Sequence, residues 1–544
     1  MKMLARCFVL AGIVTAFGCD DGGDGSSSDS GGRSSSAGSS ANGDSSSEGG
    51  TTGSGTSAAG GSSTRGGSSA TGGSSTTGGN APTGGSAATG GNSSTIGPVA
   101  SAGSSGGVGG SMAGGSSSTG IAVSGGSGAT GGVSGTGGTA ARGGTTATGG
   151  NTGSGTGNCG TPTKAQAPSG ATPFRAIEGF VTRDGSSLSL CGQPFQAFGS
   201  NLYYVQSYAV YEAGNLRTVA DGLDDAVRMS MPVMRIWAFN ETPSGDDAVI
   251  RKTPNTYNEK GLVGLDTSIA EAKKRGIRVI LVLTNYWKDY GGLPQYATWA
   301  GAKSADDFYS NTTMQGYFKD YATMFANRTN TVTGIAYKDE PAILAWEIAN
   351  ELRCPSCKDS TALLDAIDSL SKFLKSLFPK HLIADGGEGM DDTPTNWNTL
   401  SNTYPVSGFE RASFTGMVKL SALDIVSNHY YPADWGMAAS PTETVNRDAQ
   451  AWIDGHATLA KAAGKVAYWG EFGFKRGATD AERAPLYDNW LSTFYDTTHK
   501  GALALFWQLV PQSRGADDGF ACILGRDTAT VAAFEKYAQP LALR

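Results

Sequence analysis

The sequence predicts an α/β fold, a (β/α)8 TIM barrel with a small N-terminal hairpin cap, preceded by a long disordered linker. Short apolar segments with few charges recur along the later part of the chain, and such segments are typical of strands buried on both faces of a parallel sheet. Segments with helical periodicity separate most of them, as expected when helices connect parallel strands. Together these two patterns favour the barrel.

The chain begins with a segment typical of an export signal. Lys2 and Arg6 precede an apolar run over residues 7–17 that is too short to span a bilayer. We therefore expect residues 1–18 to be a signal peptide. Cys19 follows residues that resemble a bacterial lipoprotein cleavage site, which predicts a lipidated Cys19 and a secreted or cell-surface lipoprotein of a bacterium. Ordinary cleavage nearby, without a lipid, is the alternative.

A low-complexity segment follows the signal. Most of the 81 glycines of the 544-residue chain lie before about residue 158, where they alternate with Ser, Thr and Ala. Such a composition buries too little apolar surface to offset its ordering entropy, so we expect residues 19–158 to be a disordered linker. The lack of large apolar residues disfavours a β-solenoid. Residues 159–544 hold nearly all the aromatic residues and are long enough for one large barrel domain.

The sequence predicts a hairpin followed by eight strands with helices between most of them. Residues 180–195, centred on Arg183-Asp184-Gly185, predict a hairpin that caps one end of the barrel. The strands are expected at 196–204, 233–239, 279–287, 343–351, 381–388, 424–431, 466–473 and 502–510. The helices are expected at 221–230, 268–275, 315–328, 361–377, 445–463 and 481–499, with the connection between the fifth and sixth strands the least clearly helical. An open doubly wound sheet is the alternative, but no Gly-rich phosphate loop follows the first strand.

Two predicted strands carry a glutamate at the carboxyl end. Glu351 closes the fourth strand and Glu471 lies near the end of the seventh. Catalytic groups of (β/α)8 barrels lie at this end of the strands, and an unpaired carboxylate inside a strand is costly. Glycoside hydrolysis uses a pair of carboxyl groups flanking the bond. The competing interpretation is two structural salt bridges at the barrel rim.

Other strand ends carry residue types that recognise sugars. Aromatic rings stack on sugar faces, while amide, imidazole, guanidinium and carboxyl groups bond the hydroxyls. Core packing would instead favour Val, Ile and Leu. The set predicts an extended carbohydrate groove and comprises Asn201, Tyr203, Tyr204, Arg235, Trp237, Asn285, Trp287, Glu388, His429, Tyr431 and Trp507.

Five cysteines lie beyond Cys19, so at least one of them is expected to be unpaired. Cys354 and Cys357 are predicted to form a local disulfide, because no second CxxC completes a zinc site. Cys159 and Cys191 are a plausible second bridge. The net charge of −7, with dispersed cations, argues against nucleic-acid binding. We expect a monomer without a cofactor or a catalytic metal.

At the level of motifs the domain resembles the endo-β-1,4-mannanases of glycoside hydrolase family five. The resemblance covers nearly all of residues 175–540, and the segment Asp289-Tyr-Gly-Gly292 favours mannanases over related cellulases. Its motifs are Arg235-Ile-Trp-Ala-Phe239, Asn285-Tyr-Trp-Lys-Asp-Tyr-Gly-Gly292, Trp346-Glu-Ile-Ala-Asn-Glu351, His429-Tyr-Tyr-Pro432, Gly470-Glu-Phe-Gly473 and Phe506-Trp507.

The resemblance implies roles for the matching residues. Glu351 is the implied acid/base and Glu471 the implied nucleophile of a retaining reaction, which requires carboxyl groups about 5–5.5 Å apart. Asn350 is implied to bond the sugar 2-hydroxyl. The remaining implied roles are orientation of Glu471 by Arg235 and Tyr431, support of the acid/base by His429, a subsite floor at Trp507, and leaving-group contacts at Arg353 and Glu388.

The chain departs from the family pattern at one position, and other activities on the same scaffold stay open. The family usually has proline after the acid/base, whereas this chain has Leu352, which could loosen the loop carrying Arg353. From the charges we expect Arg235 to lower the pKa of Glu471 and burial to raise that of Glu351. The alternatives are a β-1,4-glucanase, an exo-β-mannosidase and a non-catalytic polysaccharide-binding protein. β-Mannan is the expected substrate.

Overall fold

The computed structural model describes residues 161–397, 399–475, 478–515 and 518–543. The predicted signal peptide, residues 1–18 with the proposed lipidation at Cys19, and the predicted linker, residues 19–158, lie outside the described residues. Within the described ranges, every helix is too short or too polar to cross a membrane.

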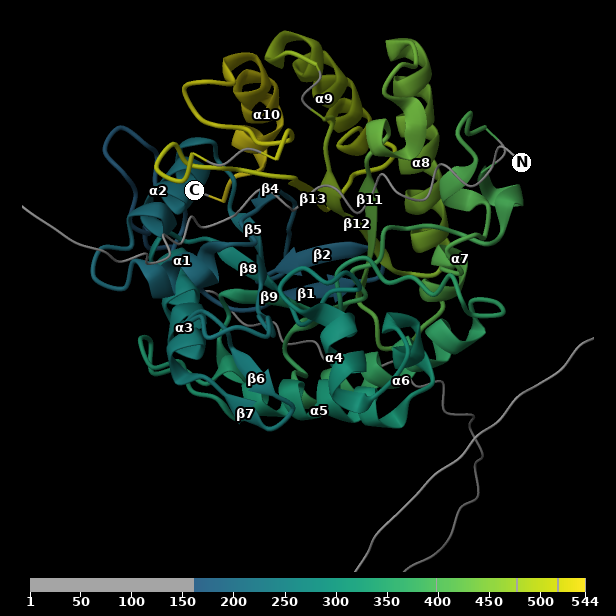
Figure 1. Cartoon of the computed structure of the whole chain (residues 1–544). Helices are drawn as coiled ribbons and strands as arrows, with labels where there is room; N and C mark the ends of the chain where they lie inside the picture. The colour runs from purple at the N-terminus through teal and green to yellow at the C-terminus, as the bar shows by residue number, and fades with distance from the viewer. Residues whose placement is uncertain (1–160, 398, 476–477, 516–517, 544) are drawn as a thin grey trace, which may run out of the picture. The chain divides into compact units, whose positions relative to one another are not determined.

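Eight parallel strands close into a barrel, which confirms the predicted fold (Figure 1). Each strand is almost wholly buried, because the barrel interior covers one face and the surrounding helices cover the other. In order around the barrel the strands are β4 (Ala197–Asn201), β5 (Val233–Trp237), β8 (Arg278–Val282), β9 (Ile343–Glu347), β10 (Leu382–Ala384), β11 (Ile425–Tyr430), β12 (Val466–Phe472) and β13 (Leu503–Phe506).

Helices surround the barrel on its outside (Figure 1). In the described part of the connection between the fifth and sixth strands, α7 is the one α-helix and is short, as the weak helical pattern there predicted; 3-10 helices at Pro394–Trp397 and Tyr404–Val406 precede it. The helices are α1 (Val205–Tyr211), α2 (Arg217–Arg228), α3 (Glu259–Lys274), α4 (Gly292–Ala300), α5 (Thr312–Asn327), α6 (Thr361–Leu377), α7 (Phe414–Met417), α8 (Thr442–Ala462), α9 (Asp480–Phe494) and α10 (Thr528–Leu541). A small antiparallel pair, β6 (Arg251–Thr253) and β7 (Thr256–Tyr257), precedes α3.

Helix α3 begins nine residues before the predicted start because two glycines conceal its pattern. Asn258 caps its first turn by accepting a hydrogen bond from the Lys260 N–H. A Cβ at Gly261 or Gly264 would lie under 3 Å from the backbone of the preceding loop or of α1. These glycines therefore let the helix pack closely, although glycine normally disfavours a helix interior.

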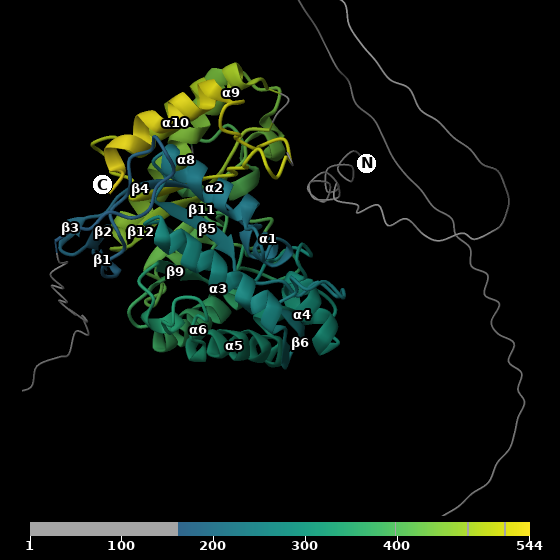
Figure 2. The same cartoon turned by 90° about the vertical axis from the view of Figure 1, so that its left-hand side faces the viewer.

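The N-terminal hairpin covers the amino end of the barrel. Its strands are β1 (Val181–Asp184), β2 (Ser187–Leu190) and β3 (Gln193–Pro194). Val181, Leu188 and Phe195 pack with the first buried residues of the barrel strands, such as Val233 and Leu503, into one apolar cluster. Figure 2 shows β1–β3 at the opposite end of the molecule from α1 and α4. The predicted cap is confirmed.

Both ends of the described chain also lie at the amino end of the barrel. The Arg175 N–H donates to the carbonyl of Leu543, and Leu543 packs against the apolar cluster under the hairpin. Arg278, the first residue of β8, donates to the Gly179 carbonyl. The chain therefore enters and leaves the domain on the face away from the carboxyl ends of the strands.

All eight barrel strands end before their predicted carboxyl ends, and the difference is most informative at β9 and β10. β9 ends at Glu347 rather than 351, and β10 ends at Ala384 rather than 388. Beyond β9 the chain keeps one parallel bridge, between Asn285 and Asn350, and then turns at Glu351, whose φ is 57°. Glu351 is therefore held on a turn just above the barrel rather than in a strand.

Candidate active site

The structure brings Glu351 and Glu471 together at the carboxyl end of the barrel. Glu471 lies within β12, whereas Glu351 lies four residues beyond β9. One oxygen of each carboxyl group and one ring nitrogen of His429 all lie within 4.8 Å of one another. The side chains are 13% exposed for Glu351 and 5% for Glu471. The pair therefore forms a close, largely buried site.

Arg235 and Tyr431 bind opposite oxygens of Glu471. The Arg235 Nη1 donates to Oε1 at 2.6 Å, and the Tyr431 hydroxyl donates to Oε2 at 2.6 Å. Arg235 also donates from Nη1 to the Asn201 side chain and from Nη2 to that of Asn350. One guanidinium therefore orients the carboxylate of Glu471 and the amide of Asn350 together.

Glu351 is bound by two neutral donors. The indole N–H of Trp287 donates to its Oε2 at 2.6 Å, and Nδ1 of His429 lies 3.1 Å from its Oε1. Burial lowers the pKa of His429, so the ring is neutral at neutral pH and Nδ1 can carry the donated proton. Asn285, the other predicted residue on this side, accepts a hydrogen bond from the Asn350 amide at 3.1 Å.

Burial raises the pKa of both carboxyl groups. For Glu351 it outweighs the nearby charge of Arg353 and the hydrogen bond from Trp287. For Glu471, burial outweighs the lowering of the pKa by His429, by Arg235 and by the hydrogen bond from Tyr431. The expected net lowering of the Glu471 pKa is therefore wrong. The two carboxyl groups differ in their partners, because Glu471 bonds directly to a cation and Glu351 does not.

Arg353 lies beside Glu351 but is already bound on several sides. It forms a two-pronged ion pair with Glu388, and its Nη1 lies 2.9 Å from Glu410 and donates to the Tyr404 hydroxyl. Its guanidinium carbon lies 5.0 Å from the centre of the Trp287 ring. Burial raises the pKa of Glu388 to about 7, although Arg353 opposes the rise. This network fixes the orientation of Arg353.

On the opposite side of the barrel mouth, Trp507 follows β13 and packs among aromatic rings. Its ring is stacked on that of Tyr203, with centroids 5.1 Å apart and planes inclined by 7°, and its N–H donates to Asp518. Trp237 contacts Tyr203 at 4.9 Å and is 6% exposed. Tyr204, predicted among the sugar-facing residues, is instead buried with its hydroxyl bonded to a backbone carbonyl.

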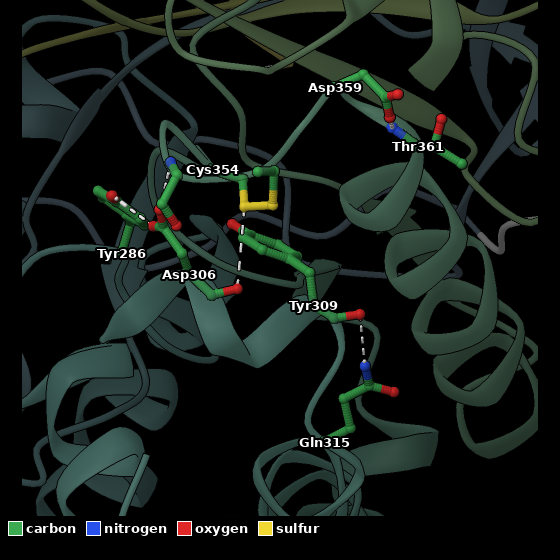
Figure 3. Close-up of a disulfide and its surroundings, with 9 residues drawn as sticks. Tyr286, Asp306, Tyr309, Gln315, Cys354, Asp359 and Thr361 are labelled. Atoms are coloured by element: carbon green, nitrogen blue, oxygen red, sulfur yellow. Dashed lines mark hydrogen bonds between the residues drawn. A yellow bond between two sulfur atoms is a disulfide. The ribbon is translucent and has the colours of Figure 1, made fainter. Parts of the chain in front are cut away.

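A disulfide joins Cys354 and Cys357 directly after Arg353, as predicted (Figure 3). Asp306 holds the same loop, because its carboxylate accepts from the Ser356 N–H and from the Tyr286 hydroxyl. Leu352 is buried on the other side of Arg353. These contacts fix the loop at both ends, and any loosening by leucine in place of proline stays a prediction.

The other cysteine predictions are partly tested. Cys522 is buried and unpaired, which confirms that one cysteine is left over. The predicted Cys159–Cys191 bridge is not tested, because Cys159 lies outside the described residues.

Replacing Cys354 and Cys357 together by serine is expected to lower the free energy of unfolding by about 2 kcal/mol, because the closed loop is short. Denaturant unfolding of both proteins without reductant measures the difference. The kcat is expected to change little, since Arg353 keeps Glu388, Glu410 and Tyr404. A large loss of kcat with an unchanged fold would show that the disulfide itself positions the site.

The sequence interpretation missed several residues that complete the site. Glu347 is paired with Arg235 and is absent from the predicted site residues, although a carboxylate in the middle of the apolar segment 343–351 indicates a buried partner. Glu410, Tyr404 and Asp518 lie on long loops whose course no local pattern predicts. Among the described residues, only Glu351, His429 and Glu471 cluster closely enough to hold a metal ion, and Arg235 beside them opposes a second cation.

A (β/α)8 barrel with two adjacent carboxyl groups at the carboxyl ends of its strands has the arrangement that glycoside hydrolases use. Comparison with known families agrees, because residues 178–506 match the model of the GH family 5 β-mannosidase-like proteins. The chain belongs to this family.

Similar proteins share a mannan-related name. Mannan endo-1,4-β-mannosidase 7 of Arabidopsis thaliana is 32% identical over 67% of this chain and 86% of its own length. Mannan endo-1,4-β-mannosidase 4 of Solanum lycopersicum is 32% identical over 66% of this chain and 91% of its own. The crystal structure of the endo-1,4-β-mannanase from Rhizomucor miehei is 30% identical, with a TM-score of 0.59 over 67% of this chain and all of that one.

Proposed function

We propose that this protein is an extracellular, retaining endo-β-1,4-mannanase. It hydrolyses internal β-1,4-mannosidic bonds of mannans, glucomannans or galactomannans by double displacement. The observation that carries the retaining mechanism is the approach of the two carboxyl groups, with oxygens within 4.8 Å. Inverting enzymes need about 6.5–9.5 Å between these groups to admit a water molecule. The names of the similar proteins support mannan as the substrate.

In the first step, Glu471 attacks the anomeric carbon while Glu351 donates its proton to the departing oxygen. The glycosidic bond breaks and a glycosyl ester of Glu471 forms. In the second step, Glu351 takes a proton from water, whose oxygen attacks the same carbon and releases Glu471. Two inversions return the original configuration, and Glu351 regains its proton.

The surrounding contacts support this division of roles. Arg235 bonds directly to Glu471 and favours its charged form, which the nucleophile needs. Burial keeps Glu351 protonated to higher pH, which a proton donor needs. Asn350 accepts from Arg235 through Oδ1, and its Nδ2 has a second hydrogen available for the sugar 2-hydroxyl.

The positions of the aromatic residues support a direction for the substrate across the barrel mouth. Trp287, Arg353 and Glu388 follow β8, β9 and β10, on the side of the proton donor, so they face the leaving group. Trp507 and Tyr203 follow β13 and β4, on the side of Glu471, and Trp507 floors the subsite of the glycosyl ester. A chain lying across both sides has sugar on each side of the cleaved bond.

The proposed location rests on the amino-terminal sequence and on the disulfide. Disulfides persist in oxidising compartments, so the Cys354–Cys357 disulfide supports a location outside the cytoplasm. We propose export through the signal at residues 1–18, with attachment through a lipid on Cys19, and a monomeric enzyme.

The full-length protein is expected to release mixed short manno-oligosaccharides from mannan and little sugar from carboxymethylcellulose. Chromatography of the products, beside a Glu471→Ala control, checks this expectation. Monosaccharide alone would indicate an exo-mannosidase. Faster cleavage of carboxymethylcellulose would indicate a glucanase, and binding without cleavage a polysaccharide-binding protein.

A further inference from the structure

A second carboxylate lies beneath the proposed nucleophile and has no part in the mechanism above. Glu347 is the last residue of β9 and is fully buried. Its Oε1 accepts from Arg235 Nε at 3.0 Å and from Nη2 at 2.5 Å. Its Oε2 accepts from the Tyr468 hydroxyl. Every polar atom of this side chain is therefore bonded, and its main partner is the arginine that orients Glu471.

Arg235 is thus one cation shared by two carboxylates. Its Nη1 lies 2.6 Å from Glu471 and its Nη2 2.5 Å from Glu347, while the arginine itself is 0% exposed. With both carboxyl groups ionised, the three buried side chains sum to one negative charge. The proposed reaction changes this sum, because the ester of Glu471 carries no charge.

We propose that Glu347 is a positioning residue that remains the counter-ion of Arg235 when Glu471 is consumed in the glycosyl ester. The proposal rests on the double-displacement function above. A buried arginine that loses its only charged partner is strongly destabilised. Because Glu347 stays bonded to Nε and Nη2, the covalent intermediate keeps an arginine with a carboxyl partner and a fixed orientation.

Sharing Arg235 also affects the free enzyme. An arginine paired with Glu471 alone would stabilise that carboxylate more strongly and make it a weaker nucleophile. Glu347 draws part of the positive charge toward itself. Its negative charge therefore favours attack by Glu471 and disfavours departure of Glu471 from the ester.

The matched test is Glu347→Gln, which keeps the shape and one oxygen acceptor but removes the charge. The kcat/KM is expected to fall by about 100-fold, comparable to the loss of one charge-stabilising contact at an active site. The acid limb of its pH profile reports ionisation of Glu471 in the free enzyme. Losing a like charge nearby lowers the pKa of Glu471, so this limb is expected to move down by roughly one pH unit.

A second variant separates charge from packing. Glu347→Asp keeps the charge with a shorter side chain, so its acid limb is expected to stay at the wild-type position even if kcat falls. Tyr468→Phe is the matched control, because it removes the other bond of Glu347 and leaves all three charges. Circular dichroism shows whether each variant is folded.

Any of three results would overturn the proposal. An unshifted acid limb in folded Glu347→Gln would show that the charge of Glu347 does not act on Glu471. An upward shift would show that Glu347 acts only by holding Arg235 in place. If Glu347→Gln does not fold, a shifted limb in Glu347→Asp contradicts the proposal. All profiles are measured on whichever aryl β-glycoside the wild type hydrolyses, so failure on mannan would count against the proposed function alone.

Discussion

Replacing Glu471 by alanine is expected to abolish hydrolysis of mannan, with kcat falling by at least about 10⁴-fold. The reason is that the proposed glycosyl ester forms on the Glu471 carboxylate, which alanine lacks. The loss is also expected with an activated aryl β-mannoside, because a better leaving group does not replace a missing nucleophile. Initial rates on both substrates, with the fold checked by circular dichroism, measure the effect.

Azide provides the sharper test of this role. In the cavity left by Glu471→Ala, a small anion can attack the anomeric carbon of an activated mannoside directly. A single displacement inverts the configuration, so the expected product is the α-mannosyl azide. Recovery of the β-azide from this variant would assign the nucleophile to another residue.

Replacing Glu351 by alanine is expected to have a different signature. Hydrolysis of mannan falls by about 10²–10⁴-fold, because the sugar leaving group needs a proton. An aryl mannoside with a good leaving group should still form the ester rapidly and then accumulate it, since no base activates water. A burst of aryl alcohol followed by a slow steady rate is the expected observation.

The same variant also gives opposite stereochemistry with azide. The ester on Glu471 still forms, so azide attack is the second inversion and yields the β-mannosyl azide. The basic limb of the pH profile, which reflects deprotonation of Glu351, is expected to disappear. A basic limb that persists unchanged in Glu351→Ala would show that another group donates the proton.

Much of this site was predictable because barrel topology places residues that are distant in sequence at one end. The apolar segments carrying Glu347–Glu351 and Glu471 were recognisable without any contact information. Parallel strands that close into a barrel then bring their carboxyl ends together, so Arg235, His429 and Tyr431 converge on the two glutamates.

The remaining contacts were not predictable because they depend on loops and on the balance of opposing effects. Glu410 and Asp518 reach Arg353 and Trp507 from loops without periodicity. Tyr204 differs from Tyr203 by one position, and it is buried with its hydroxyl bonded to the Leu509 carbonyl, a contact distant in sequence. The direction of the Glu471 pKa shift depends on whether burial or the neighbouring positive charges have the larger effect. The sequence shows the charges but not the degree of burial.

The placement of both ends of the described domain at the amino end of the barrel has a practical consequence. Residues 165–179 and Leu543 meet at the amino end of the barrel, whereas Glu351 and Glu471 open at the other end. A solid support, a fusion partner or an anchor joined through either end of the domain is therefore attached at the rear of the enzyme. Immobilised in this way, the enzyme keeps its catalytic mouth directed outward, toward insoluble polymer.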